Sequence, residues 1–263
     1  MSKFYYFTLI LISFNSCAQH NRDCIYVDPN IVIVNCGKVD RYKISEAVLK
    51  IRNLKAKVIA LDIIFFDKRP TDSIFIKRMT GETPIILSMG DKNDSSYFNI
   101  ANCFNGPHCI NGNDKDRIEF LFPYQKHNEK FRDSFELLVL KYFNGEKYSN
   151  MKTYLTSFDL SSLEAKAKIE FNGNSLSCFH SIDINDLEEL TEDLINDKIV
   201  IIGYFGTNPD SPLNKDKDRY AFKVAATPNK KVNYMYATLI SANIISNLIR
   251  KDIRESELNK IKK

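Results

Sequence analysis

The chain has 263 residues, of which 44% are hydrophobic and 27% are charged. This is the composition of a globular protein, and it excludes an intrinsically disordered chain, which would have too few apolar residues to form a core. The formal net charge is only +4, and the one basic concentration, from Arg250 to Lys263, also holds acidic residues. No basic stripe with interleaved aromatic residues is present, so the sequence does not indicate a nucleic-acid partner.

The first residues predict export. Lys3 precedes an apolar run from Phe4 to Ile12, which has the length of a signal-peptide core and is too short to span a membrane. The segment ends in Ser16-Cys17, which resembles the lipobox of bacterial lipoproteins, although the two residues before Ser16 depart from that pattern. We therefore expect a signal peptide over residues 1–16, lipidation and membrane attachment at Cys17, and a linker over residues 17–30. An ordinary secretory leader is the alternative.

Export places the remaining cysteines where disulfides form. Five of the six cysteines lie after Cys17, so at least one stays unpaired. Cys103 and Cys109 flank a turn-rich stretch that could bring them within disulfide distance, and we predict them as a possible pair. His108 adds one potential ligand beside them, but no second pair completes a tetrahedral set, so no metal site is expected.

The first part of the mature chain predicts a β-α-β unit. Ile31 to Val34 is a β-branched run, helical spacing of apolar residues follows from Ile44 to Leu54, and Val58 to Phe66 is apolar except for Asp62. Runs without polar alternation indicate strands that are buried on both faces of a sheet. We expect the two strands to be parallel, with a right-handed crossover.

Local patterns predict the remaining elements. In the first half of the chain they are a helix capped by Asp72, a strand from Ile85 to Ser88, a long loop over 90–116, a strand from Arg117 to Leu121 and a helix from Phe131 to Asn144-Gly145. In the second half they are a hairpin of 168–171 and 179–184 around Asn172-Gly173, a short helix over 187–194, a strand from Lys198 to Gly203 and a helix from Tyr236 to Ile249. Together they predict a single α/β domain with a central, mostly parallel or mixed sheet and flanking helices.

Several segments, in order, resemble the class-two CHASE family, the sensory extracellular domains associated with cyclases and histidine kinases. The first segment is Ala56 to Phe66 with Asp72, and the second is Phe171 to Asn174 with Phe179 and Ile182-Asp183. The third is Asp197 to Gly203 with Asp218-Arg219-Tyr220 and Thr227-Pro228, and the fourth is Met235-Tyr236-Ala237 with Ile240 to Ile245. On this resemblance we assign residues 31–250 to the sensory domain and 251–263 to a charged tail. Ser241 and Ala237 depart from the family, whose members usually have His and Gly there.

The resemblance implies a non-catalytic sensory or ligand-binding domain without a cofactor. Such domains are usually followed by transmembrane helices and a cytoplasmic output domain, so we expect a detached, lipid-anchored sensor in the cell envelope, facing the periplasm or the exterior. It would bind an unknown small molecule and act on a membrane signalling protein. A structural or interaction lipoprotein and a hydrolase remain the alternatives, although no G-x-S-x-G or H-E-x-x-H motif is present.

Candidate ligand residues follow from the expected sheet edge. Asp62 is a carboxylate in an apolar strand, which is costly unless it is hydrogen-bonded or paired, and it could face a ligand or organise the sheet end. If its strand and the one ending at Gly203 are parallel neighbours, a crevice should lie at their carboxyl ends, bordered by Asp62, Asp67 and Asp218. Thr227 lies in the same loop as Asp218. This loop could equally be a structured surface loop with no part in ligand binding. We add Ser241 to the candidates because of its place in the family pattern.

Overall fold

The computed structural model describes residues 27–65, 69–70, 72–89, 103–107, 110–111, 117–118, 120–121, 124–127, 130–145, 167–168, 178–204, 219–222 and 233–261. A six-stranded sheet in the order β11-β1-β12-β2-β3-β4 forms its centre, and every pairing in it is parallel. Its strands are β1 (Asp28–Asn35), β2 (Val58–Asp62), β3 (Ile85–Met89), β4 (Cys103–Pro107), β11 (Phe179–Asp183) and β12 (Ile199–Gly203). The predicted single α/β domain is confirmed.

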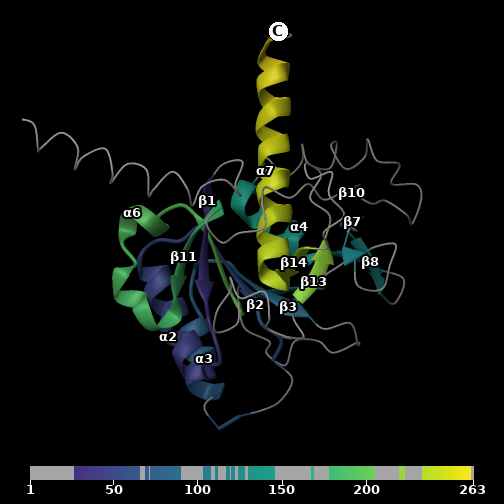
Figure 1. Cartoon of the computed structure of the whole chain (residues 1–263). Coiled ribbons are helices and arrows are strands. Elements are labelled where there is room, and N and C mark those ends of the chain that lie inside the picture. The colour runs from purple at the N-terminus through teal and green to yellow at the C-terminus, as the bar shows by residue number, and fades with distance from the viewer. Residues whose placement is uncertain are drawn as a thin grey trace, which may run out of the picture.

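Helices cover both faces of this sheet (Figure 1). One layer holds α2 (Arg41–Asn53), α3 (Asp72–Met79), the 3-10 helix η3 (Ile184–Glu189) and α6 (Glu192–Ile195). The other layer holds α4 (Phe135–Asn144) and α7 (Ala237–Ile261). In Figure 1, α7 runs beyond the sheet and ends at the carboxyl terminus of the chain. Among the residues that the structure describes, no helix has both the length and the apolar content to cross a membrane.

The two layers explain why the central strands are apolar at every position. Ile31 and Ile33 of β1 contribute to the core beneath α4 and α7, whereas Val32 and Val34 contribute to the core beneath α2 and α3. All four side chains are completely buried. Because successive residues point to opposite faces of a strand, a sheet that is covered on both faces requires an uninterrupted apolar run.

Polar side chains and a glycine set the ends of the helices. Asp40 caps α2 by accepting a 2.9 Å hydrogen bond from the backbone N–H of Lys43. Ser134 caps α4 through the N–H of Leu137 at 3.2 Å, and Gly145 ends α4 with a φ of +57°. The predicted end of this helix at Asn144-Gly145 is therefore confirmed.

Two glycines allow the helices of the second layer to lie directly on the sheet. A Cβ added to Gly106 of β4 would stand 2.6 Å from the Cα of Phe135 in α4. A Cβ added to Gly203 of β12 would clash with the side chain of Thr238 in α7. Both positions therefore require the residue that has no side chain.

The structure corrects two expectations in the first half of the chain. The expected loop over 90–116 contains β4, which completes the edge of the main sheet, and β5 (Ile110–Asn111). The expected strand from Val58 to Phe66 ends at Asp62, so the last apolar residues leave the sheet.

Two further expectations differ from the pairing that the structure describes. Among the described residues the expected hairpin is not seen: β10 (Ala167–Lys168) pairs with β7 (Phe120–Leu121), whereas β11 joins β1 in parallel. Its turn, Asn172-Gly173, lies outside the described residues. The expected helix from Phe131 begins only at Phe135, because Phe131 belongs to β9 (Lys130–Asp133), which pairs with β8 (Tyr124–His127).

Other differences concern the extent of elements. The expected helix over 187–194 divides into η3 and α6, and the last helix continues to Ile261, through most of the expected tail. The expected strand from Arg117 divides into β6 (Arg117–Ile118) and β7. β6 pairs with β13 (Arg219–Phe222), which also pairs with β14 (Asn233–Tyr236).

Candidate functional site

The candidate site lies where β2 leaves the sheet. β2 and β12 are parallel neighbours with Asp62 opposite Gly203, which confirms the condition set for a crevice at their carboxyl ends. In open α/β sheets, ligands bind outside the carboxyl ends of the strands. The structure has a pocket of about 150 Å³ at this edge.

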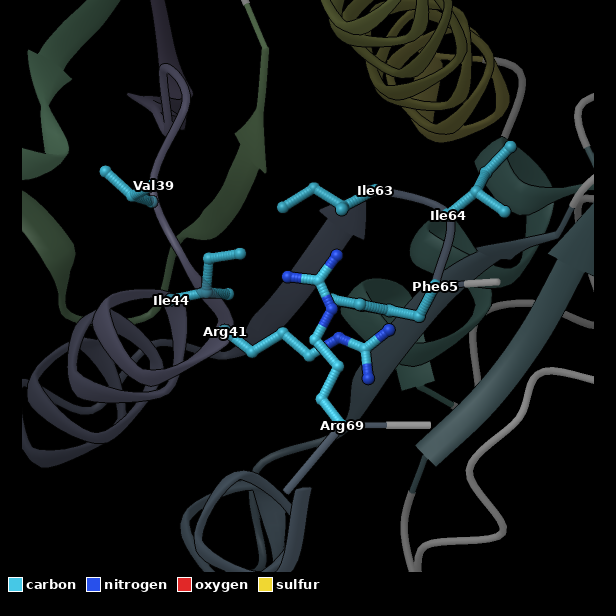
Figure 2. A pocket seen from close by; sticks show the side chains of 7 residues that line it. All are labelled: Val39, Arg41, Ile44, Ile63, Ile64, Phe65 and Arg69. Carbon is cyan, nitrogen blue, oxygen red and sulfur yellow. The ribbon is translucent and has the colours of Figure 1, made fainter. Parts of the chain in front are cut away.

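The pocket has apolar walls and two cationic side chains (Figure 2). Its lining residues are Val39, Arg41, Ile44, Ile63, Ile64, Phe65 and Arg69. They come from the segment between β1 and α2, the first turns of α2 and the segment that follows β2. Figure 2 shows the side chains of Arg41 and Arg69 reaching into the same space beside Phe65.

Arg41 is held rigidly in this wall. Its Nη1 lies 2.7 Å from Oδ1 of Asp72, and the two side chains are only 5% and 11% exposed. The Arg41 guanidinium also lies 5.3 Å from the ring centroid of Phe65, within the range of a cation–π contact. An ion pair this deeply buried fixes the position of the guanidinium, because separating the charges would leave one of them uncompensated.

Asp72 links the two arginines. Its Oδ2 accepts a 2.7 Å hydrogen bond from the backbone N–H of Arg69, while its Oδ1 binds Arg41. Burial alone would raise the pKa of Asp72, but the hydrogen bonds from Arg41 and Arg69 and the positive charges of both residues together hold this pKa below its ordinary value. The carboxylate therefore stays ionised and orders the start of α3 beneath the pocket.

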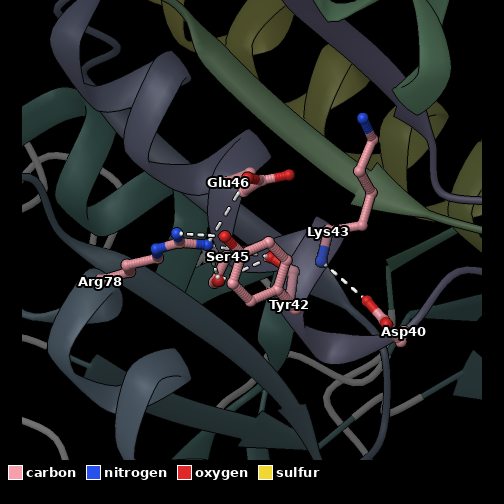
Figure 3. Close-up of polar contacts among 6 residues, drawn as sticks. All are labelled: Asp40, Tyr42, Lys43, Ser45, Glu46 and Arg78. Carbon is pink, nitrogen blue, oxygen red and sulfur yellow. Dashed lines mark hydrogen bonds and ion pairs between the residues drawn. The ribbon is translucent and has the colours of Figure 1, made fainter. Parts of the chain in front are cut away.

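A second polar network fixes the first turns of α2 against α3 (Figure 3). Arg78 of α3 donates to the hydroxyl of Tyr42 at 3.0 Å and to Oγ of Ser45 at 3.2 Å, and its guanidinium lies 4.1 Å from the centre of the Tyr42 ring. Glu46 lies 3.9 Å from the same guanidinium. Since Arg41 stands beside Tyr42, this network also positions the arginine that faces the pocket.

The residues predicted for the crevice are only partly described. Asp62 is half-buried at the end of β2, next to Ile63, but it is not among the lining residues. Asp67, Asp218 and Thr227 lie outside the described residues, as does Cys17. The expectation that they border a crevice therefore remains a prediction.

Ser241 lies elsewhere in the molecule. It is completely buried in α7, on the face of the sheet opposite to α2, and its hydroxyl donates a 2.9 Å hydrogen bond to Oε1 of Glu136 in α4. Its role here is to join two helices, and the structure does not bring it to the pocket.

The cysteines differ from the expected pair. Cys103, at the start of β4, is a free thiol, so the predicted disulfide with Cys109 is wrong for this structure; Cys109 itself lies outside the described residues. Cys103 stands in register with Ile85 of β3, and burial raises the pKa of its thiol to about 11, so it is protonated at neutral pH. Cys178 is disulfide-bonded, with a partner outside the described residues. In the described part of the chain, no group of three or more His, Cys, Asp or Glu side chains could hold a metal ion.

The two arginines of the pocket were not predicted from the sequence. Arg41 directly follows the capping residue of a helix, and Arg69 precedes Asp72 by three residues, which is the spacing of the Arg69–Asp72 hydrogen bond. Both features are visible in the sequence. What could not be read there is that the chain segments after β1 and β2 enclose one cavity.

Comparison with known proteins identifies a family that matches nearly the whole chain. The sequence model of the family described as "CHASE2 domain" matches residues 26–261. No curated protein and no solved structure matches the chain significantly.

Proposed function

The chain belongs to the CHASE2 domain family of extracellular sensory domains, and from that membership we propose that it is a non-catalytic ligand-binding module of a lipid-anchored envelope protein. Its ligand site is the pocket at the carboxyl end of β2. The proposal also includes a signalling protein in the membrane that responds to ligand binding.

The position and chemistry of the pocket carry this proposal. A cavity with mainly apolar walls and a few convergent polar groups is the usual form of a small-molecule site. Five of the seven lining residues are apolar, and both remaining ones are arginines. The pocket also lies at the sheet edge where the loops of parallel strands collect binding groups.

The same residues argue against catalysis at this site. The described lining residues include no nucleophile and no acid–base pair, since the guanidinium of arginine is not a general base in the ordinary pH range. The carboxylate of Asp72 beside the pocket is engaged by Arg41 and Arg69. A binding role therefore accounts for this chemistry better than a hydrolytic one.

Attachment to a membrane is proposed on the sequence before the domain. The family match begins at residue 26, only nine residues after Cys17 (26 − 17 = 9). A diacylated or triacylated Cys17 would hold the domain close to the membrane surface, because more than one acyl chain is needed for stable anchoring.

The test is a thermal-shift screen of the full chain against small organic acids, amides and amines, with a variant that fills the pocket. Ile63 lines the pocket and is only half-buried, and Figure 2 shows its side chain pointing into the space beside Arg69, so Ile63→Trp should fill the cavity. Leu49→Trp is the matched control, because Leu49 is 38% exposed on α2 and does not line the pocket.

We expect at least one compound to raise the Tm of the wild type and of Leu49→Trp, and to have no effect on Ile63→Trp. A ligand present at about 100 times its Kd stabilises the folded state by about 2.7 kcal/mol, which a melting curve detects readily. A screen in which no compound shifts the Tm, or in which Ile63→Trp responds like the wild type, would contradict the assignment of this pocket and favour a structural or interaction role.

A further inference from the structure

We propose that the pocket recognises the carboxylate of a small molecule whose remaining part is apolar and no larger than about a single ring. This inference rests on the proposed function and adds the chemical class of the ligand. The charge, the shape and the rigidity of the described side chains carry it.

The charged side chains among the described lining residues are both cationic. Arg41 and Arg69 contribute two positive charges to the lining, and Asp72 supplies one negative charge behind them. These three residues therefore sum to +1 (2 − 1 = +1). An anion in the pocket would receive hydrogen bonds from guanidinium groups, which form stronger and more directional contacts with carboxylates than neutral donors do.

The apolar walls select among anions. The lining also contains five apolar residues: Val39, Ile44, Ile63, Ile64 and Phe65. A fully hydrated inorganic anion has no apolar surface to bury against them. Burial of apolar ligand surface against them contributes roughly 25 cal/mol per Å². The ligand class that satisfies both parts of the lining has a carboxylate at one end and hydrocarbon at the other.

The volume limits the size of the hydrocarbon part. The cavity measures about 150 Å³. An engineered apolar cavity of that size, about 150 Å³, is known to hold benzene. A monocyclic or short-chain carboxylate therefore fits, whereas a nucleotide or an oligosaccharide does not.

The two arginines have different roles in this recognition. Arg41 is buried and bound to Asp72, so its guanidinium is preorganised in the pocket lining. Arg69 is exposed and lies beside Phe65 in Figure 2, so a ligand can reach it and its replacement leaves the core intact. The decisive substitution is therefore Arg69→Gln.

The experiment compares three ring compounds of nearly equal shape with the full chain, by calorimetry and thermal shift. Benzoate carries the carboxylate, benzamide is its neutral counterpart and benzylamine is its cationic counterpart; butyrate and inorganic phosphate complete the set. We expect benzoate or butyrate to bind, benzamide to bind at least about 10-fold more weakly, and benzylamine not to bind.

The variants locate the effect on one side chain. Arg69→Gln should weaken carboxylate binding by about 10- to 100-fold, the usual range for loss of a charged hydrogen-bonding partner. Lys77→Gln removes the same charge from an exposed position on α3 that does not line the pocket, and it should leave binding unchanged. Equal losses in both variants would show a general charge effect and overturn the assignment to Arg69.

The outcomes separate this inference from the proposed function. If benzamide or benzylamine binds as well as the carboxylates and Ile63→Trp abolishes that binding, the pocket is a ligand site but the carboxylate class is wrong. If inorganic phosphate binds as tightly as benzoate and competes with it, the apolar walls are not used and the class is also wrong. If no compound of any charge binds, the proposed function fails as well.

Discussion

The hydroxyl of Ser241 in α7 donates a 2.9 Å hydrogen bond to Oε1 of Glu136 in α4, and both residues are completely buried. Glu136 stands in the first turn of α4, where a carboxylate interacts favourably with the positive end of the helix dipole. The hydrogen bond joins the two helices of one layer and gives the buried carboxyl group of Glu136 a polar partner.

Removal of this donor should destabilise the domain. Ser241→Ala leaves the buried Glu136 oxygen without its hydroxyl, and we expect a loss of about 1–3 kcal/mol in the free energy of unfolding. Urea denaturation measures the change. Because α7 lies on the opposite face of the sheet from the pocket, binding of benzoate should be unaffected. A stability change within about 0.5 kcal/mol, as for ordinary surface substitutions, would contradict the structural role of this hydrogen bond.

Gly203 should be intolerant of even one additional carbon atom. In Gly203→Ala the new Cβ would overlap the side chain of Thr238 and stand 2.9 Å from its Cβ. Overpacking of this kind typically costs about 1–3 kcal/mol. Thr238→Ala removes the two nearest atoms, so the double variant should be more stable than the sum of the single effects indicates. Strictly additive changes in the free energy of unfolding in a double-mutant cycle would show that the contact with Thr238 does not cause the loss of stability in Gly203→Ala.

Arg52 should stabilise the end of α3. Its guanidinium donates to the backbone carbonyls of Arg78, Met79 and Thr80 at 2.9, 2.6 and 2.8 Å, respectively, and these groups have no partner within the helix. We expect Arg52→Ala to lower the free energy of unfolding by about 1.5–3 kcal/mol.

The shape of the guanidinium can be tested separately at this position. Arg52→Lys keeps the charge but loses the planar arrangement of donors, so it should recover only part of the loss. Equal stabilities of the Lys variant and the wild type would show that charge alone is sufficient. Guanidinium chloride or urea melts of the three proteins decide between these results.

The buried ion pair should make stability depend on pH in the acid range. The pKa of Asp72 is lowered from its ordinary value of 3.8, so its stabilising contribution is fully present above that value and is lost as the pH falls through the lower, folded-state pKa. Asp72→Asn should therefore be less stable than the wild type at neutral pH. When Tm is plotted against pH, the curves of the two proteins should converge as the pH falls well below 3.8.

A carboxylate at the surface, outside the buried ion pair, provides the control for this pH dependence. Glu188 is exposed in η3, so Glu188→Gln should follow the wild-type curve at every pH. A gap between Asp72→Asn and the wild type that stays constant down to the lowest pH would show that the ion pair does not titrate as the structure implies.

Membrane attachment should depend on Cys17. Cell fractionation should place the wild type in the membrane fraction and Cys17→Ser in the soluble fraction, because the acyl chains supply the anchoring energy. A soluble wild type, or a variant that remains in the membrane fraction, would refute the lipoprotein interpretation.

The central strands were predictable from the sequence because burial on both faces leaves a local signature. Ile31 to Val34 and Ile199 to Gly203 are apolar without interruption, and both form strands at the centre of the sheet. β4 was missed because Cys103–Pro107 contains Asn, Gly and Pro and lies at the sheet edge, where fewer apolar contacts are required.

Long-range pairing explains two further differences. Asn172-Gly173 is a strong local signal for a hairpin, yet β11 pairs with β1, about 150 residues away in the sequence. The pocket is a similar case, since Arg41 and Arg69 meet only because β1 and β2 leave the same edge of the sheet. Sequence patterns report the environment of one segment, and they do not report which distant segment provides it.

The strand order also bears on how the protein reaches its destination. β1 is the first strand of the chain, but both of its neighbours, β11 and β12, lie in the last third of the sequence. During synthesis, β1 therefore has no partner in the described sheet until 148 residues have followed it and β11 is complete (183 − 35 = 148). Contacts so distant in sequence form slowly, because the intervening loop must close first. A chain that is exported in the unfolded state has to stay unfolded until it has crossed the membrane, and this topology delays assembly of the central sheet until most of the domain has been made.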